Sequence, residues 1–135
     1  MEEDVRREIV AYRRQKAKDL LHDVDVLIAN GLWNSAVNRM YYACFHMVSS
    51  LLIQRGIEVK SHKGVRQAFG FQFVRTGVLP MECGRIFSKI YDKRQASDYD
   101  DFRTFTKEEI DSLYPEIKFL IGAVDELIEK EKLVS

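Results

Sequence analysis

The chain has 135 residues, a length that predicts one compact domain spanning residues 1–135. Hydrophobic residues make up 46% and charged residues 31% of the chain, which excludes disordered and low-complexity proteins. Its 21 Lys and Arg residues balance 21 Asp and Glu residues, so binding to nucleic acid or to a membrane would need a local charged patch.

The sequence carries no signal for export or for a membrane segment. It begins MEEDVRREIV, without the basic start and apolar run of a secretion signal, and no stretch approaches 18 apolar residues. Cys44 and Cys83 lie in apolar stretches without a CxxC or a Cys/His cluster, so neither a disulfide framework nor a zinc site is expected. We therefore expect a cytoplasmic protein with no metal, no cofactor and no membrane contact.

The first two predicted elements are long helices. Apolar residues recur every three and four positions over residues 2–30, and Gly31 provides the stop. The second helix, over about residues 33–55, is apolar around most of its circumference. Such a helix usually lies at the centre of a fold.

Three further helices follow, which makes the predicted fold all-α. A short one begins at Ser61, a good N-cap, and a fourth covers about residues 81–96. The fifth opens at Thr106 with a capping box and extends to about residue 132. Pro115 predicts a kink or a restart within it.

Charge is divided unevenly along the chain. Residues 1–53 hold seven basic and seven acidic residues, residues 54–94 hold nine and three, and residues 95–135 hold five and eleven. In the basic block three cations repeat every four residues and share one face of the predicted fourth helix: Arg85, Lys89 and Lys93. That face is either an ordinary solvated surface or a surface for an anionic partner.

Cations also surround the start of the predicted third helix. Lys60, Lys63 and Arg66 lie close to Ser61 and His62 in the sequence. The unpaired backbone N–H groups at a helix start favour an anion, so a phosphate could bind there. The alternative is that Ser61 only caps the helix and His62 is a surface residue.

Arg39 and His46 are two helical turns apart and share a face of the second helix, with Tyr42 between them. On a helix this apolar, we expect both to be buried and therefore to need polar partners. They form either an internally paired structural set or part of a polar network or interface.

The stretch IYDKRQASDYDDF places Arg94 at the end of the predicted fourth helix. Asp98, Asp100 and Asp101 follow closely enough to pair with it or with Lys93. Three carboxylates can also bind Mg²⁺ or Ca²⁺, but the spacing, the glycine and the closing Glu of a calcium loop are missing. We therefore expect no metal here.

Three stretches together resemble the HEPN family of small prokaryotic helical domains, in particular its short stand-alone members: NRMYYACFH at 38–46, KSHKGV at 60–65 and RQASDYDD at 94–101. The resemblance covers residues 17–127. It implies an antiparallel up-and-down bundle of four to five helices that forms a homodimer and is encoded beside a minimal nucleotidyltransferase. Many members are ribonucleases and toxins of toxin–antitoxin pairs, in which an Arg and a His act on RNA at a site assembled across the dimer.

The chain departs from that motif, because Tyr99 stands where the His would follow Arg94. An unperturbed Tyr has a pKa of about 10, against about 6.5 for His, and is a poor general base near neutral pH. One hypothesis is therefore a nucleotide- or RNA-binding module with a degenerate nuclease motif, acting with a nucleotidyltransferase partner. The second is a metal-independent ribonuclease toxin using Arg94 with Asp98, Tyr99 or a His from elsewhere, His46 or His62. The third is a purely structural interaction protein.

Three expectations follow. A homodimer should form, because the second helix is apolar on more sides than a small bundle can cover. Arg94 should hydrogen-bond Asp98 or a neighbouring carboxylate, and the ring of Tyr99 should pack under the following loop. One positive surface should bind phosphate-containing ligands through Lys60, Ser61, His62, Lys63, Arg66, Arg85, Lys89 and Lys93.

Overall fold

A computed structural model describes residues 2–99 and 103–134, apart from the side chains of Tyr99, Leu133 and Val134. This part of the chain is helical and contains no strand, which confirms the predicted all-α fold. Its elements are α1 (Glu3–Ala29), α2 (Trp33–Gln54), α3 (His62–Phe69), the π-helical turn η1 (Gly70–Val74), α4 (Met81–Tyr99) and α5 (Lys107–Val134).

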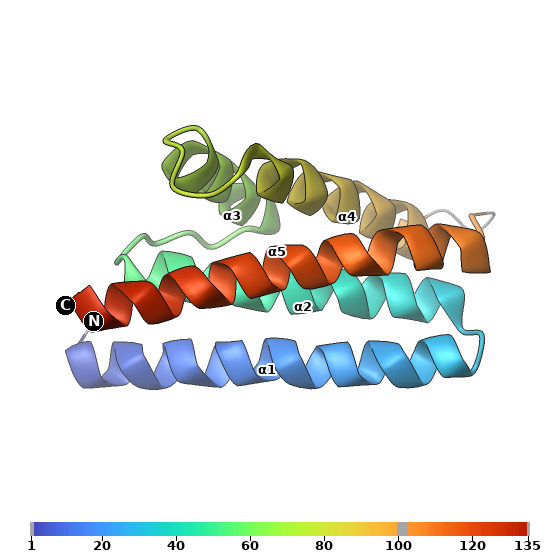
Figure 1. Cartoon of the computed structure of the whole chain (residues 1–135), viewed down its shortest axis with the longest axis horizontal. Helices are drawn as coiled ribbons and strands as arrows, with labels where there is room; N and C mark the ends of the chain where they lie inside the picture. The colour runs from blue at the N-terminus through green and yellow to red at the C-terminus, as the bar shows by residue number, and fades with distance from the viewer. Residues whose placement is uncertain (1, 100–102, 135) are drawn as a thin grey trace.

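The four long helices form an up-and-down bundle (Figure 1). The chain runs along α1, returns along α2, passes through the short α3, and then runs along α4 and returns along α5. The two termini consequently lie at the same end. The bundle implied by the family resemblance is therefore confirmed.

The predicted central position of α2 is also confirmed, because this helix contacts α1, α3, α4 and α5. Most of its apolar residues are covered within a single chain, while some, such as Tyr42 and Phe45, are only partly buried, and the homodimer stays a prediction. The buried apolar residues of α2 are Ala36, Val37, Met40, Tyr41, Ala43, Cys44, Met47, Val48, Leu51 and Leu52.

The two predicted N-caps are present. The Ser61 hydroxyl accepts a hydrogen bond from the Gly64 amide at 2.9 Å. At the start of α5, Thr106 Oγ1 accepts from the Glu109 amide at 3.2 Å, and a Glu109 carboxylate oxygen accepts from the Thr106 amide at 3.3 Å. This reciprocal pair is the expected capping box.

Of the two outcomes predicted at Pro115, a restart is wrong, because α5 continues through this residue, and a kink stays a prediction. Leu113 and Ile117, on either side of the proline, are buried in the core and hold both parts of the helix against the bundle. Farther along, α5 is tied to α1 by Arg14, which is 8% exposed and donates from Nε to Asp125 at 2.7 Å.

Candidate functional site

Arg94 lies near the end of α4 and faces α2. Its side chain is 13% exposed, and its Nε lies 2.9 Å from Oδ2 of Asp98, which confirms the predicted ion pair. Its Nη2 donates to the Tyr42 hydroxyl at 3.0 Å. The guanidinium also lies 5.4 Å from the ring centroid of Tyr41 and 5.5 Å from that of Tyr42. Two aromatic rings therefore hold this cation in place together with a carboxylate.

A short chain of hydrogen bonds extends from Asp98 back to α2. The Asn38 amide nitrogen donates to Asp98 at 3.0 Å, and its oxygen accepts from Nη1 of Arg39 at 3.1 Å. Arg39 is exposed, so the expectation that it is buried is wrong, and it belongs to this polar network and is not paired with His46. The helix turns Arg39 outward, whereas His46 faces Arg13 of α1 across 3.5 Å.

His62, the first residue of α3, meets the same tyrosines. Its ring stacks on Phe45 with the centroids 4.2 Å apart, and its Nδ1 lies 2.6 Å from the Tyr41 hydroxyl. Burial and the nearby charge of Arg94 both lower the pKa of His62 from its usual 6.5. The imidazole is therefore neutral at pH 7, while burial raises the pKa of Tyr41 and keeps that phenol protonated.

These contacts bring residues from α2, α3 and α4 into one group, which we call the Arg94 cluster: Asn38, Tyr41, Tyr42, His62, Arg94 and Asp98. It combines a fixed cation, a neutral imidazole and aromatic faces. Such a set can bind a phosphate through the guanidinium, stack a base on the rings, and accept a proton at the imidazole.

Sequence reasoning named His62 only as one of two histidines that could act with Arg94, and it assigned no role to Tyr41 or Asn38. One signal was present, because Asn38 and Tyr42 are four residues apart and so lie on one face of α2. The side chain of Tyr99 lies outside the described part of the structure, as do Asp100 and Asp101. The packing expected for Tyr99 therefore stays a prediction.

A family model described as HEPN domain matches residues 10–127 of the chain. The chain belongs to the HEPN domain family. A UPF0332 protein of Thermotoga maritima is 35% identical to this HEPN protein over 124 residues, 92% of this chain and 94% of its own. A protein of Methanocaldococcus jannaschii named "putative toxin" is 32% identical over 130 residues, 96% of each chain. A second protein of that organism with the same designation is 33% identical over 99 residues, 73% of this chain and 67% of its own. The names of these relatives support a toxin-like HEPN module.

The cations around the start of α3 in this HEPN protein have separate surroundings. Lys60 and Lys63 are exposed, and the hydroxyl of Ser61 is occupied in capping the helix. The Arg66 guanidinium lies 4.4 Å from the Tyr91 ring centroid and 3.7 Å from the Asp92 carboxylate. Phosphate binding by this segment stays a prediction.

The cations of α4 that share one face, which we call the stripe, are Arg85, Lys89 and Lys93. They face acidic residues of α5. Arg85 lies 2.8 Å and Lys89 lies 2.6 Å from the two carboxylate oxygens of Glu116. Lys93 lies 4.0 Å from Glu109. Hydrogen bonds from Lys89 and Arg85 lower the pKa of Glu116, so this carboxylate is charged at neutral pH. The positive charge of the stripe is thus partly compensated within the chain, and its phosphate binding stays a prediction.

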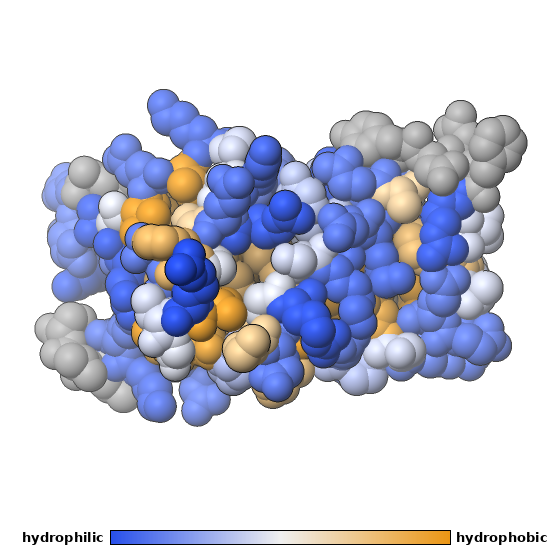
Figure 2. Space-filling view, turned by 90° about the horizontal axis from the view of Figure 1, so that it is seen from above, coloured by the Kyte–Doolittle hydropathy of each residue, from blue (hydrophilic) through white to orange (hydrophobic). Residues whose placement is uncertain are grey.

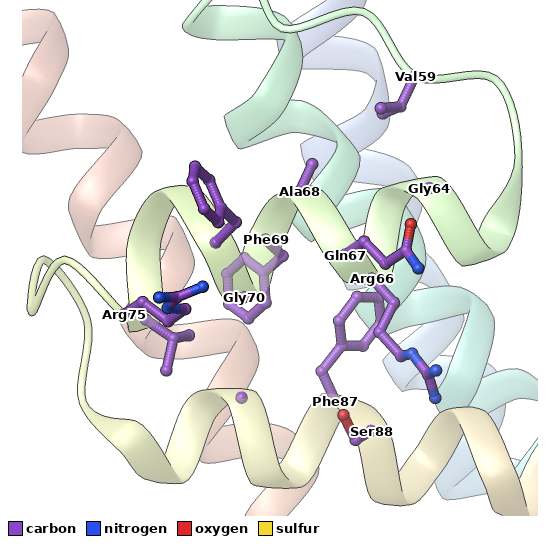
Figure 3. A pocket seen from close by; sticks show the side chains of 13 residues that line it. Val59, Gly64, Arg66, Gln67, Ala68, Phe69, Gly70, Arg75, Phe87 and Ser88 are labelled. Carbon is purple, nitrogen blue, oxygen red and sulfur yellow. The ribbon is translucent and has the colours of Figure 1, made fainter.

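An apolar pocket of about 880 Å³ lies between the α3–η1 segment and α4 (Figure 3). Figure 2 looks down onto this side and shows hydrophobic residues gathered toward the end where α3 lies, with hydrophilic residues around and across them. Three large apolar side chains near the pocket are exposed: Phe71, Val78 and Met81. This pocket differs in character from the Arg94 cluster.

Among the described helices, none combines the length and the apolar composition needed to cross a bilayer. Within the same residues, no three His, Cys, Asp or Glu side chains gather into a set that could hold a metal ion. Cys44 and Cys83 are buried and free, and burial raises the pKa of the Cys83 thiol to about 11. Neither thiol is a nucleophile at neutral pH.

Proposed function

We propose that this HEPN protein is a toxin-like module that binds RNA or a nucleotide through the Arg94 cluster and whose nuclease motif is degenerate. The observation that carries the proposal is that Arg94 lies against two tyrosine rings, one of which, Tyr41, also contacts the neutral His62. Cations that track a phosphate backbone and aromatic faces that stack bases are the common elements of single-stranded nucleic acid sites. Lys60, Lys63 and Arg66 extend the positive charge on the neighbouring segment, and Tyr99 in place of His removes the family's base.

Binding of a fluorescent single-stranded RNA oligonucleotide at low salt tests this proposal. Arg94→Gln should weaken binding tenfold or more, because it removes a charge-assisted contact to phosphate. Arg85→Gln is the matched control, since it removes the same charge from the same helix but outside the cluster, and should change affinity less than about twofold. Equal losses in both variants, or no binding by the parent protein, would contradict the proposal.

We further propose that the protein acts in the cytoplasm as a homodimer with a minimal nucleotidyltransferase partner. The family resemblance suggests both associations, and the exposed Phe71, Val78 and Met81 supply apolar surface for one of them. Light scattering should give twice the chain mass of 15.8 kDa. Phe71→Ser should reduce the dimer, whereas Phe119→Ser, a 50% exposed phenylalanine on α5, should leave it intact. A mass of one chain for the parent protein would contradict the dimer.

A second candidate function is a metal-independent ribonuclease, and the contact that both His62 and Arg94 make with Tyr41 favours it. When Nδ1–H of His62 donates to the Tyr41 hydroxyl, Nε2 presents a lone pair that can take the proton of an RNA 2′-hydroxyl. The 2′-oxygen then bonds to phosphorus, the bond between phosphorus and the 5′-oxygen breaks, and the 5′-oxygen takes a proton from water, while Arg94 stabilises the added negative charge on the phosphate. The products would be a 2′,3′-cyclic phosphate and a 5′-hydroxyl.

Incubation of RNA with the protein in excess EDTA separates the two functions. A degenerate site predicts no cleavage by the parent protein. A ribonuclease predicts cleavage that is lost in both His62→Gln and Arg94→Gln and retained in His22→Gln, which alters an exposed histidine on α1. That second pattern would replace the binding module with the enzyme.

A further inference from the structure

A small cavity, lined in part by Phe45, lies between α1, α2 and the segment that leads to α3. Its volume is about 140 Å³. Aliphatic side chains from α2 and the following segment form much of its wall, Leu52, Ile57 and Val59 among them. Three polar residues also line it: Arg13, Ser49 and Lys60. None of its lining residues is acidic.

Ser49 is the unusual member of this lining. The residue is 5% exposed, and its buried hydroxyl has no hydrogen-bond partner among the described residues. The hydroxyl of the neighbouring Ser50, by contrast, is paired, because it donates to the His46 carbonyl at 2.8 Å. Buried hydroxyls in folded proteins are normally paired, so an unpaired one that lines a cavity indicates a partner outside the protein.

The two cations that line the cavity have no ion pair among the described residues, although such pairs are frequent elsewhere in the chain. Arg13 donates from Nη1 to Nδ1 of His46 at 3.5 Å, and an imidazole that accepts from a guanidinium is neutral. Burial, with the charges of Arg13 and Lys16 and the neighbouring His62, lowers the pKa of His46. The helix α1 and the segment before α3 thus each contribute a cation to the lining, and no acidic residue of the lining compensates them.

We propose that this cavity binds a small carboxylate with a short aliphatic tail. The carboxylate accepts hydrogen bonds from Arg13, Lys60 and the Ser49 hydroxyl, and the tail packs against Leu52 and Ile57. The volume equals that of roughly four or five water molecules at about 30 Å³ each, which suits a chain of about four to six carbons. Arg13 and Ser49 take no part in the proposed RNA binding, to which Lys60 adds only charge, so the inference does not depend on that binding.

Calorimetric titration of the full chain with sodium butyrate and sodium hexanoate tests the inference, with the His46 ring resonances followed in parallel by NMR. One of the two carboxylates should bind saturably and shift the His46 signals. The neutral amide of the same chain length should bind at least tenfold more weakly. Arg13→Gln and Lys60→Gln should each weaken carboxylate binding about tenfold or more, and Ser49→Ala about threefold or more.

Arg7→Gln is the matched control, because Arg7 is an exposed arginine of the same helix α1 that lies 3.8 Å from Glu3. It should leave carboxylate binding unchanged. Absence of saturable binding, equal affinity for the amide, or insensitivity to Ser49→Ala would each overturn the inference. Inorganic phosphate that competes with the carboxylates only weakly would support the need for a tail, whereas phosphate binding without carboxylate binding would overturn it.

Discussion

Arg85 and Arg94 lie on the same helix and carry the same charge, yet their surroundings differ. The Arg85 side chain is 54% exposed, and its partner is Glu116 of α5. The Arg94 side chain is 13% exposed and contacts a carboxylate of its own helix and two tyrosines of α2. The first cation joins two helices at the surface, whereas the second is oriented inside a group of chemically varied side chains.

This difference shows why a count of basic residues along α4 does not locate a binding site. Glu116 compensates the charge of Arg85 and Lys89 within the chain, so a phosphate would have to displace it. Asp98 compensates Arg94 too, but from four residues away, where it fixes the direction of the guanidinium. The neutral His62 beside it adds a proton acceptor that α5 does not offer to Arg85.

Replacing Arg94 should lower the stability of the fold more than replacing Arg85. Arg94→Ala should lower the free energy of unfolding by about 1–3 kcal/mol, because it removes charge-assisted hydrogen bonds in a mostly buried setting. Arg85→Ala should cost less than about 1 kcal/mol, since exposed ion pairs contribute little. Urea denaturation measures both, and equal losses would remove the distinction between the two sites.

The tyrosine contact can be tested alone with Tyr42→Phe, which keeps the ring and deletes the hydroxyl that accepts from Arg94. We expect a loss of about 0.5–1.5 kcal/mol, the net value of a typical hydrogen bond. Combining it with Arg94→Ala should give less than the sum of the two losses, because the same bond is removed twice. An additive result would mean that this hydrogen bond contributes nothing to stability.

The smallest effect concerns the titration of His62. Its folded-state pKa is below the unfolded value of about 6.5, so its neutral form favours folding above that pH, and this contribution is lost as the pH falls through the folded-state pKa. Arg94→Ala should raise the pKa of His62, because it removes one cause of the depression, whereas Arg85→Ala should leave it unchanged. NMR titration of the ring measures both, and a larger rise in the Arg85 variant would contradict the assigned neighbours.

The features that were predicted from sequence depend on residues close together in the chain. Helical periodicity located the long helices. The caps at Ser61 and Thr106 each join two residues that are three positions apart, and the Arg94–Asp98 pair spans one helical turn. The features that were missed are contacts between helices. Nothing local to His62 indicates that it contacts Tyr41, which also contacts Arg94.

The wrong predictions also concern features that depend on contacts between helices. The outward turn of Arg39 depends on which side of α2 the neighbouring helices cover, and periodicity alone assigned too much of that helix to the interior. The burial of Arg14 has no local signal either, because its carboxylate partners lie on α5. For Pro115, core packing on both sides of the proline outweighed the local preference for a break.

The salt dependence of RNA binding tests most directly that Arg94, and not the stripe, contacts phosphate. Affinity should fall as salt rises, with a slope of about 0.7 in log affinity against log salt for each phosphate contact to a single strand. The account predicts that Arg94→Gln lowers this slope by about one contact, while Arg85→Gln leaves it unchanged. A slope that falls in the Arg85 variant and stays constant in the Arg94 variant would contradict the account.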